Sequence, residues 1–143
     1  MKTFLLSCLL LLGALLAPAA EAQLARLEVT VHGLEPATGT VEVSLFNSAT
    51  TFLKKPFLQK AAAVDGAEKL TFEFVGLLDG EYAVVVVHDE NDNKVLDTGF
   101  LGFGGEGIGY SNDAVPWLLG RPSFNAARFT IGEEDMAISV TLR

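Results

Sequence analysis

The stretch EYAVVVVHDENDNKVLD, residues 81–97, joins the most apolar run after the first 22 residues to a polar loop. Its four consecutive valines, residues 84–87, are β-branched, which favours an extended strand. A strand that is apolar at successive positions is covered on both of its faces. We therefore predict a central strand over residues 81–88, with a polar loop attached to its end.

The polar loop carries oxygen side chains at alternate positions. Counted from Asp89 as position 1, they stand at positions 1, 3, 5 and 9, and the carbonyl of Val95 stands at position 7. Calcium loops of the EF-hand type use these offsets to turn oxygens inward. Oxygen donors favour calcium, magnesium or manganese over zinc or copper, and we predict calcium. The predicted ligands are Asp89, Asn91, Asn93, Val95 and Asp97, with Glu106 from the glycine-rich segment that follows.

The loop departs from an EF-hand in three respects. Lys94 replaces the glycine of position 6, Phe100 replaces the glutamate of position 12, and a strand rather than a helix leads into it. The alternative interpretation is a solvated turn, because Asn and Asp tolerate turn geometry. Asp92 stands at an even offset and is expected to face solvent.

Residues 1–22 have the features of a secretory signal peptide. A basic start precedes an apolar run over residues 4–16, and Ala20-Glu21-Ala22 fits the small-x-small cleavage pattern. The run is shorter than the roughly 20 residues needed to span a bilayer. We therefore expect cleavage before Gln23, an exported protein in the periplasm or outside the cell, and no stable membrane insertion after cleavage.

Cysteine content bears on how the exported chain would be stabilised. The single cysteine, Cys8, lies inside the signal segment, so the mature chain has none. A bound metal would then be a more useful source of stability outside the cytosol, where other proteins use disulfides.

Residues 23–143 are predicted to form one all-β domain, an antiparallel β-sandwich. Many short alternating segments with turns between them favour that architecture. Residues 98–125 are expected to form one long loop rich in glycine and aromatic residues, and residues 48–63 stay open, with a helical turn ended by Pro56 as one interpretation. Besides the central strand, the predicted strands are residues 27–31, 41–45, 70–74, 127–131 and 137–142.

Charge and composition argue against several functions. The formal net charge of −8 gives no electrostatic basis for binding nucleic acid and disfavours anionic membranes. The mature chain has two histidines, no cysteine and no nucleophile elbow, so no catalytic residue is predicted and the chain is not expected to be an enzyme. The alternative is a hydrolase acting on cell-surface polymers, with Asp97 and Glu106 as an acid–base pair.

Three residues near the loop are candidates for surface binding of an unidentified cell-envelope or extracellular ligand. They are His88, Tyr110 and Trp117. The competing interpretation of His88 is a strand-end residue whose ring hydrogen-bonds into the long loop. Tyr110 and Trp117 would then pack that loop onto the sandwich, because aromatic side chains supply much of a small core.

The order of these motifs resembles a family of secreted bacterial proteins called domain of unknown function 2141. The resemblance implies a prealbumin- or immunoglobulin-like β-sandwich in an exported protein, without an established activity. Lys94 and Gly104 stand where the family often has glycine and proline. The matching segments are Gly80-Glu81-Tyr82-Ala83, His88-Asp89-Glu90-Asn91-Asp92-Asn93 with Asp97, Gly102 with Glu106, Gly109 with Ser111-Asn112, and Pro122-Ser123-Phe124.

Overall fold

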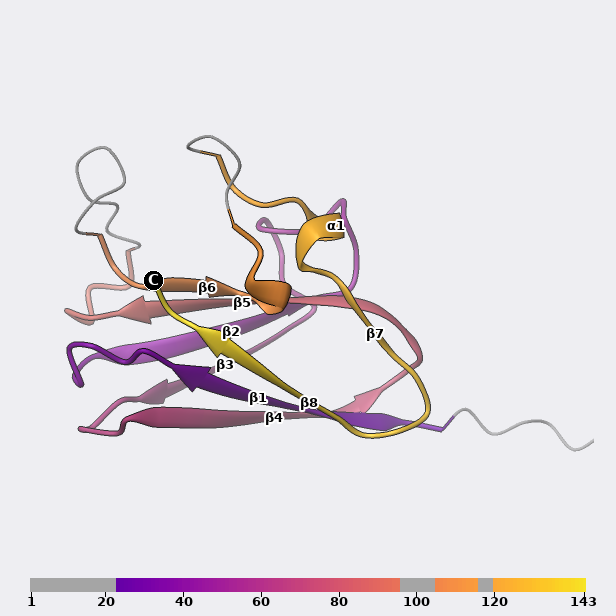
Figure 1. The fold of residues 1–143 in the computed structure, drawn as a ribbon, viewed down its shortest axis with the longest axis horizontal. Helices are drawn as coiled ribbons and strands as arrows, with labels where there is room; N and C mark the ends of the chain where they lie inside the picture. The colour runs from indigo at the N-terminus through magenta and orange to yellow at the C-terminus, as the bar shows by residue number, and fades with distance from the viewer. Residues whose placement is uncertain (1–22, 96–104, 116–119) are drawn as a thin grey trace, which may run out of the picture.

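The computed structural model describes residues 23–95, 105–115 and 120–143 (Figure 1). Most of this part of the chain is extended. Its strands are β1 (Ala25–His32), β2 (Thr40–Phe46), β3 (Leu58–Ala63), β4 (Lys69–Leu77), β5 (Gly80–Asp89), β6 (Ile108–Tyr110), β7 (Phe129–Ile131) and β8 (Met136–Thr141). Its helices are a 3-10 turn, η2 (Ser111–Asp113), and one α-helical turn, α1 (Phe124–Ala127).

Two sheets are stacked on one another, which confirms the all-β sandwich prediction (Figure 1). The first has the order β4-β1-β8, and the second has the order β3-β2-β5-β6, with β7 also paired to β5. The first two predicted strands therefore lie in opposite sheets. The pairing is antiparallel except between β1 and β8, which run parallel.

The main core lies between the two sheets. Strand β1 alternates buried and more exposed positions, so that Leu27, Val29 and Val31 are all fully buried. Phe74 of β4 is the largest fully buried side chain. Burying a side chain of this kind contributes roughly 1.5–3 kcal/mol relative to leaving it in water. The apolar residues that alternate along the sequence of β1 are thus the residues that form the core.

Strand β5 is covered on both faces, as its valine run predicts. Val84 and Val86 belong to the core between the sheets. Ala83 and Val85 point the other way, into a second cluster on the outer face of the five-stranded sheet. That cluster includes the three phenylalanines Phe46, Phe52 and Phe124, which meet edge to face.

The fold differs from the predictions in three segments. Within residues 48–63, hydrogen-bonded turns precede Pro56, and β3 then pairs with β2 as an edge strand that was not predicted. Residues 98–125 contain β6, which was assigned to a loop. The strand predicted from Ala127 begins instead at Phe129, because the Ser123 hydroxyl accepts from Ala126 N–H and caps the helical turn.

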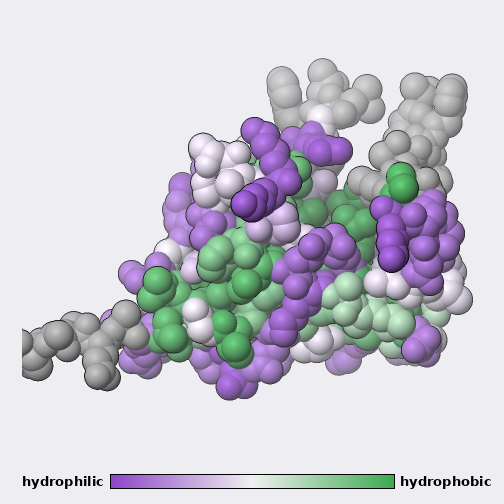
Figure 2. All heavy atoms as spheres, turned by 180° about the vertical axis from the view of Figure 1, so that it is seen from behind, coloured by the Kyte–Doolittle hydropathy of each residue, from purple (hydrophilic) through white to green (hydrophobic). Residues whose placement is uncertain are grey.

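Exposed apolar side chains lie at the opposite end of β5 from the polar loop. Figure 2 shows apolar surface gathered toward the end of the molecule where β1 begins. Phe57 is in ring contact with Tyr82, whose hydroxyl donates to the carbonyl of exposed Leu78 at 3.0 Å. Among the described residues, no helix has the length and apolar character needed to cross a membrane.

Candidate functional site

The polar loop leaves β5 beside the start of β2. Asp89 pairs with Thr40 across the two strands. Just before that pair, Gly39 has φ +82°, and a Cβ atom added to it would overlap the Asp89 carbonyl oxygen and lie 2.8 Å from the Cα atom of Glu90. Only glycine therefore fits against the first residues of the loop.

Inside the loop, three oxygen-bearing side chains accept hydrogen bonds from the backbone. The N–H groups of Asn93 and Lys94 donate to the two carboxylate oxygens of Asp89, at 3.1 and 2.7 Å. The Asn91 amide oxygen accepts from Asn93 N–H at 3.0 Å, and the Asn93 amide oxygen accepts from Val95 N–H at 2.7 Å. The side-chain oxygens at positions 1, 3 and 5 are thus all bonded to the loop's own backbone, and Asn91 and Asn93 are exposed.

The backbone at position 6 has the conformation that an EF-hand gives to glycine. Lys94 has φ 61°, and Asp92 has φ 57°. Left-handed conformations cost an L-residue roughly 1–2 kcal/mol, although Asp tolerates them better than most. The departure from glycine at Lys94 therefore does not prevent the sharp turn, but it makes the turn strained.

Replacing this lysine should relieve the strain. We expect Lys94→Gly to raise the free energy of unfolding by about 0.5–1 kcal/mol, because glycine adopts positive φ without a steric cost. Urea unfolding of residues 23–143 would measure the change. The matched control is Lys69→Gly at the start of β4, which should be destabilising because glycine weakens a strand. A loss of stability in both variants would contradict the interpretation that the backbone at Lys94 is strained.

Glu106 lies beside the Asp89 loop, where the sequence analysis expected it. Its side chain is 8% exposed, and its Oε1 atom accepts from the backbone N–H of Glu90 at 3.2 Å. The segment that carries it is aligned by the hydrogen bond from His88 N–H to the Gly107 carbonyl, at 2.9 Å. Residues 105–107 therefore place this carboxylate beside the start of the loop.

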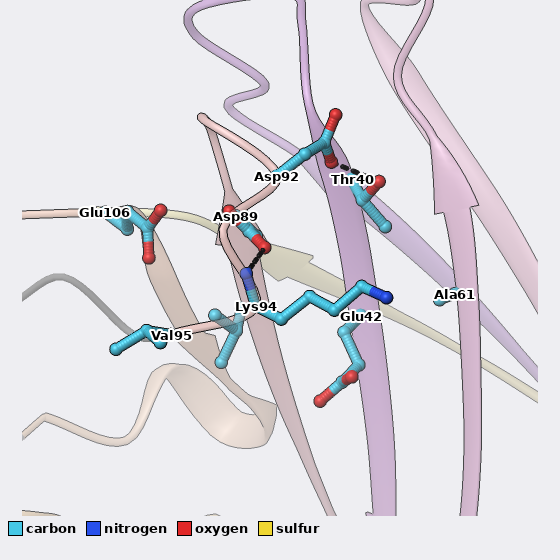
Figure 3. Close-up of a pocket in the computed structure, with 9 residues that line it drawn as sticks. Thr40, Glu42, Ala61, Asp89, Asp92, Lys94, Val95 and Glu106 are labelled. Atoms are coloured by element: carbon cyan, nitrogen blue, oxygen red, sulfur yellow. Dashed lines mark hydrogen bonds between the residues drawn. The ribbon is translucent and has the colours of Figure 1, made fainter.

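A cavity of about 520 Å³ opens between the loop and the sheet (Figure 3). The carboxylates of Glu42, Asp89, Asp92 and Glu106 line it, together with the ammonium-bearing side chain of Lys94. Figure 3 shows the Lys94 side chain extended over the sheet, with the Glu42 carboxylate pointing away from its ammonium group. Acidic groups thus outnumber basic groups around one concave surface, which favours cations.

Asp92 is exposed, as its even offset predicted, and it also makes a contact within the site. Its Oδ1 atom accepts from the Thr40 hydroxyl at 2.6 Å (Figure 3). This bond ties the middle of the loop to the start of β2. Thr40 and Gly39 were both missed as contributors to the site. The one sequence signal for them was a glycine placed immediately before a strand.

His88 is buried rather than available for surface binding. It is 0% exposed, because the central strand carries its side chain into the space between the sheets. Its Nε2 atom lies 2.7 Å from the Thr38 carbonyl, to which it donates, while Nδ1 has no hydrogen-bond partner in the described part of the chain. The ring is therefore bonded to the turn before β2 and not to the described part of the long loop.

The other candidates divide between described and undescribed residues. Tyr110 is half-buried on β6 and packs against the outer cluster. Burial raises the pKa of its hydroxyl, and Arg121 acts in the opposite direction. Asp97 and Trp117 lie outside the described residues, so the fifth side-chain ligand of the predicted site and one predicted surface aromatic are not placed.

The arrangement offers oxygen donors of mixed type. Within the described ranges, no group of three or more His, Cys, Asp or Glu side chains is placed to hold a metal ion. The predicted ligands that are described comprise two carboxylates, two amide oxygens and one backbone carbonyl. Such a set suits a hard cation that accepts neutral oxygens and water.

Comparison with known proteins identifies the family without supplying an activity. No curated protein and no solved structure matches the chain. A family model described as an uncharacterized protein conserved in bacteria (DUF2141) matches residues 29–139, which cover almost all of the described strands. The chain belongs to the DUF2141 family of uncharacterized bacterial proteins.

Proposed function

We propose that residues 89–97, together with Glu106, form a calcium-binding loop that stabilises an exported, non-catalytic β-sandwich module. The module would bind a ligand in the cell envelope or outside the cell. The observation that carries the proposal is that side-chain oxygens of Asp89, Asn91 and Asn93 are held by the loop backbone, with the buried Glu106 carboxylate bonded to the start of the same loop.

The chemistry of the donors supports calcium in particular. Calcium takes six to eight oxygen ligands in a flexible geometry, whereas magnesium demands an almost ideal octahedron. Each carboxylate oxygen can accept more than one contact, so the backbone bonds to Asp89 leave room for a cation. The same bonds also hold the loop in a turn, which reduces the ordering cost of binding.

A non-catalytic role is supported by how the described carboxylates are used. Both oxygens of Asp89 and Oε1 of Glu106 accept backbone N–H groups. A general acid would instead have to present a proton toward a substrate. The loop carboxylates therefore suit cation binding better than proton transfer.

Calcium should raise the melting temperature of residues 23–143 by about 5 °C. Few charged ligands favour a dissociation constant of about 10⁻⁴–10⁻³ M, as in extracellular calcium modules. Calcium at about ten times that constant would stabilise the fold by roughly 1.4 kcal/mol, which gives the expected shift for a domain of this size. Thermal unfolding in calcium and in chelator measures it.

Two loop variants with the same chemical change provide the control. Asp89→Asn removes a charged ligand and should abolish most of the calcium-dependent rise. Asp92→Asn removes the same charge but keeps an oxygen that can accept from Thr40, so it should retain most of the rise. Equal melting temperatures in calcium and chelator for the unsubstituted protein would overturn the proposal. So would equal calcium responses of the two variants.

A further inference from the structure

A second concave surface lies on the outer face of the five-stranded sheet, next to the calcium loop but separate from it. We call it the outer groove; it has a volume of about 480 Å³. Ligand sites for small molecules usually measure roughly 300–1,000 Å³. The outer face is already covered at one end by Phe46, Phe52 and Phe124, so the groove is the stretch of sheet between that cluster and the loop.

The floor of the outer groove is made of two rows of paired residues. The first row crosses four strands. Gln59 of β3 pairs with Ser44 of β2, Ser44 pairs with Val85 of β5, and Val85 pairs with Tyr110 of β6. Paired residues of neighbouring strands share a face, so these four side chains stand side by side. Gln59 Nε2 donates to the Ser44 hydroxyl at 3.3 Å.

The second row lies two residues along each strand, nearer to the calcium loop. Ala61 pairs with Glu42, Glu42 pairs with Val87, and Val87 pairs with Ile108. Glu42 and Val87 line both the groove and the cavity beside the loop, whereas Ala61 lines only the cavity and so lies beyond the edge of the groove floor. In both rows, the β5 and β6 half is apolar, and the β2 and β3 half carries the hydrogen-bonding groups.

Two cations stand at the walls of the outer groove. They are Lys54, from the turn before β3, and Arg121, from the segment before α1. The arginines at positions 26, 128 and 143 are in ion pairs with acidic side chains. Neither Lys54 nor Arg121 forms an ion pair within the described ranges, although the chain carries a net charge of −8. The walls therefore offer positive charge to an anion.

These features define the chemistry of an occupant. The apolar half, with the Tyr110 ring, suits the C–H face of a sugar, because tyrosine is both apolar and able to hydrogen-bond. The half with Glu42, Ser44 and Gln59 offers donors and acceptors to several hydroxyl groups. An aromatic or aliphatic acid would leave those groups opposite an apolar body and unpaired, which is costly.

We propose that the outer groove binds an acidic sugar, a hexuronate unit, with its ring on Tyr110 and its hydroxyl groups toward Glu42 and Gln59. Its carboxylate faces Lys54 and Arg121. Arginine binds carboxylates through two parallel hydrogen bonds, which adds directional preference to the charge. Binding here does not require calcium, because both cations and the first floor row lie away from the Asp89 loop, and Glu42 and Val87 are the lining residues that the groove shares with the cavity beside that loop.

The test is an NMR titration of residues 23–143 in chelator, following the side-chain amide of Gln59. The probes are glucuronate, glucose as the uncharged sugar, and benzoate as an acid without hydroxyl groups. We expect saturable binding of glucuronate, about a hundredfold tighter than that of glucose, because each of the two charge-assisted contacts is worth about tenfold. No saturable binding of glucuronate would overturn the proposal, as would equal or tighter binding of benzoate.

Substitution of two neighbouring lysines tests whether glucuronate binds in the outer groove. Lys54→Gln should weaken glucuronate binding about tenfold and leave glucose binding unchanged. Lys55→Gln removes the same charge from the next residue, which does not line the groove, and should change neither affinity. Equal losses in the two variants would place binding outside the groove. Because calcium is removed throughout, failure of this test leaves the calcium loop unaffected.

Discussion

Gly39→Ala is expected to reduce the free energy of unfolding by about 2–5 kcal/mol. The methyl group would overlap the Asp89 carbonyl oxygen and contact the Glu90 backbone, which cannot move aside without shifting the whole loop. Overpacking of this kind costs about 1–3 kcal/mol, and alanine at φ +82° costs about 1–2 kcal/mol more. The sum is a large part of the roughly 5–15 kcal/mol that stabilises a small domain.

Gly66 supplies the matched control for this substitution. It has nearly the same backbone angle, φ +78°, but no heavy atom lies within 4 Å of an added Cβ. Gly66→Ala should therefore cost only the backbone term, about 1–2 kcal/mol. Urea unfolding in chelator separates the two variants without interference from metal. Equal destabilisation would mean that β2 does not press against the loop as described.

Phe74→Ala should cost about 3–5 kcal/mol, the usual range for removing a buried phenylalanine. The side chain is 1% exposed and lies in the core between the sheets, under the ammonium group of Lys60. Its removal leaves a cavity that two hydrogen-bonded sheets cannot close. Chemical denaturation with a two-state fit would give the change in the free energy of unfolding.

The neighbouring residue tests the face assignment of β4. Val75 is 61% exposed, so Val75→Ala should change the free energy of unfolding by less than about 1 kcal/mol. If Val75→Ala were the more damaging change, the register of β4 against β1 would be wrong by one residue, because a one-residue slip exchanges the two faces.

The central strand could be predicted because two features of its sequence favour the same structure. Four β-branched valines favour an extended backbone, and the lack of alternation indicates cover on both faces. Strands β1 and β4 were predictable for the complementary reason, since their alternation marks a single buried face. In each case local preference and tertiary environment agree, which is the condition for a reliable sequence-based prediction.

Strands β3 and β6 could not be predicted because their conformation is imposed from outside. The sequence Leu58–Ala63 is mostly exposed and has no clear alternation, so its extended backbone follows from pairing with β2. Strand β6 is three residues long and pairs with β5 from within a segment rich in glycine. The parallel pairing of β8 with β1 joins the two ends of the described chain, which local sequence does not encode.

The spacing of the candidate ligands could be predicted from the sequence, but the contacts that hold the loop against β2 could not. Alternate oxygens at Asp89, Asn91 and Asn93 were read directly from the sequence. The contact of Gly39 with the loop and the bond from Thr40 to Asp92 depend on how β2 docks against β5. Contacts between segments about 50 residues apart need the register of a sheet, and alternation alone does not fix register between two particular strands.

The proposed calcium loop is tested most directly by a calcium titration of residues 23–143 followed through backbone amide chemical shifts. We predict saturable shifts at Asn93, Lys94 and Val95, whose N–H groups donate to the proposed ligand oxygens, and at Glu90, which donates to Glu106. The exposed acidic turn at residues 133–135 serves as the internal control and should shift weakly without saturating. Absence of saturable shifts in the loop, or equal shifts in the acidic turn, would contradict the account.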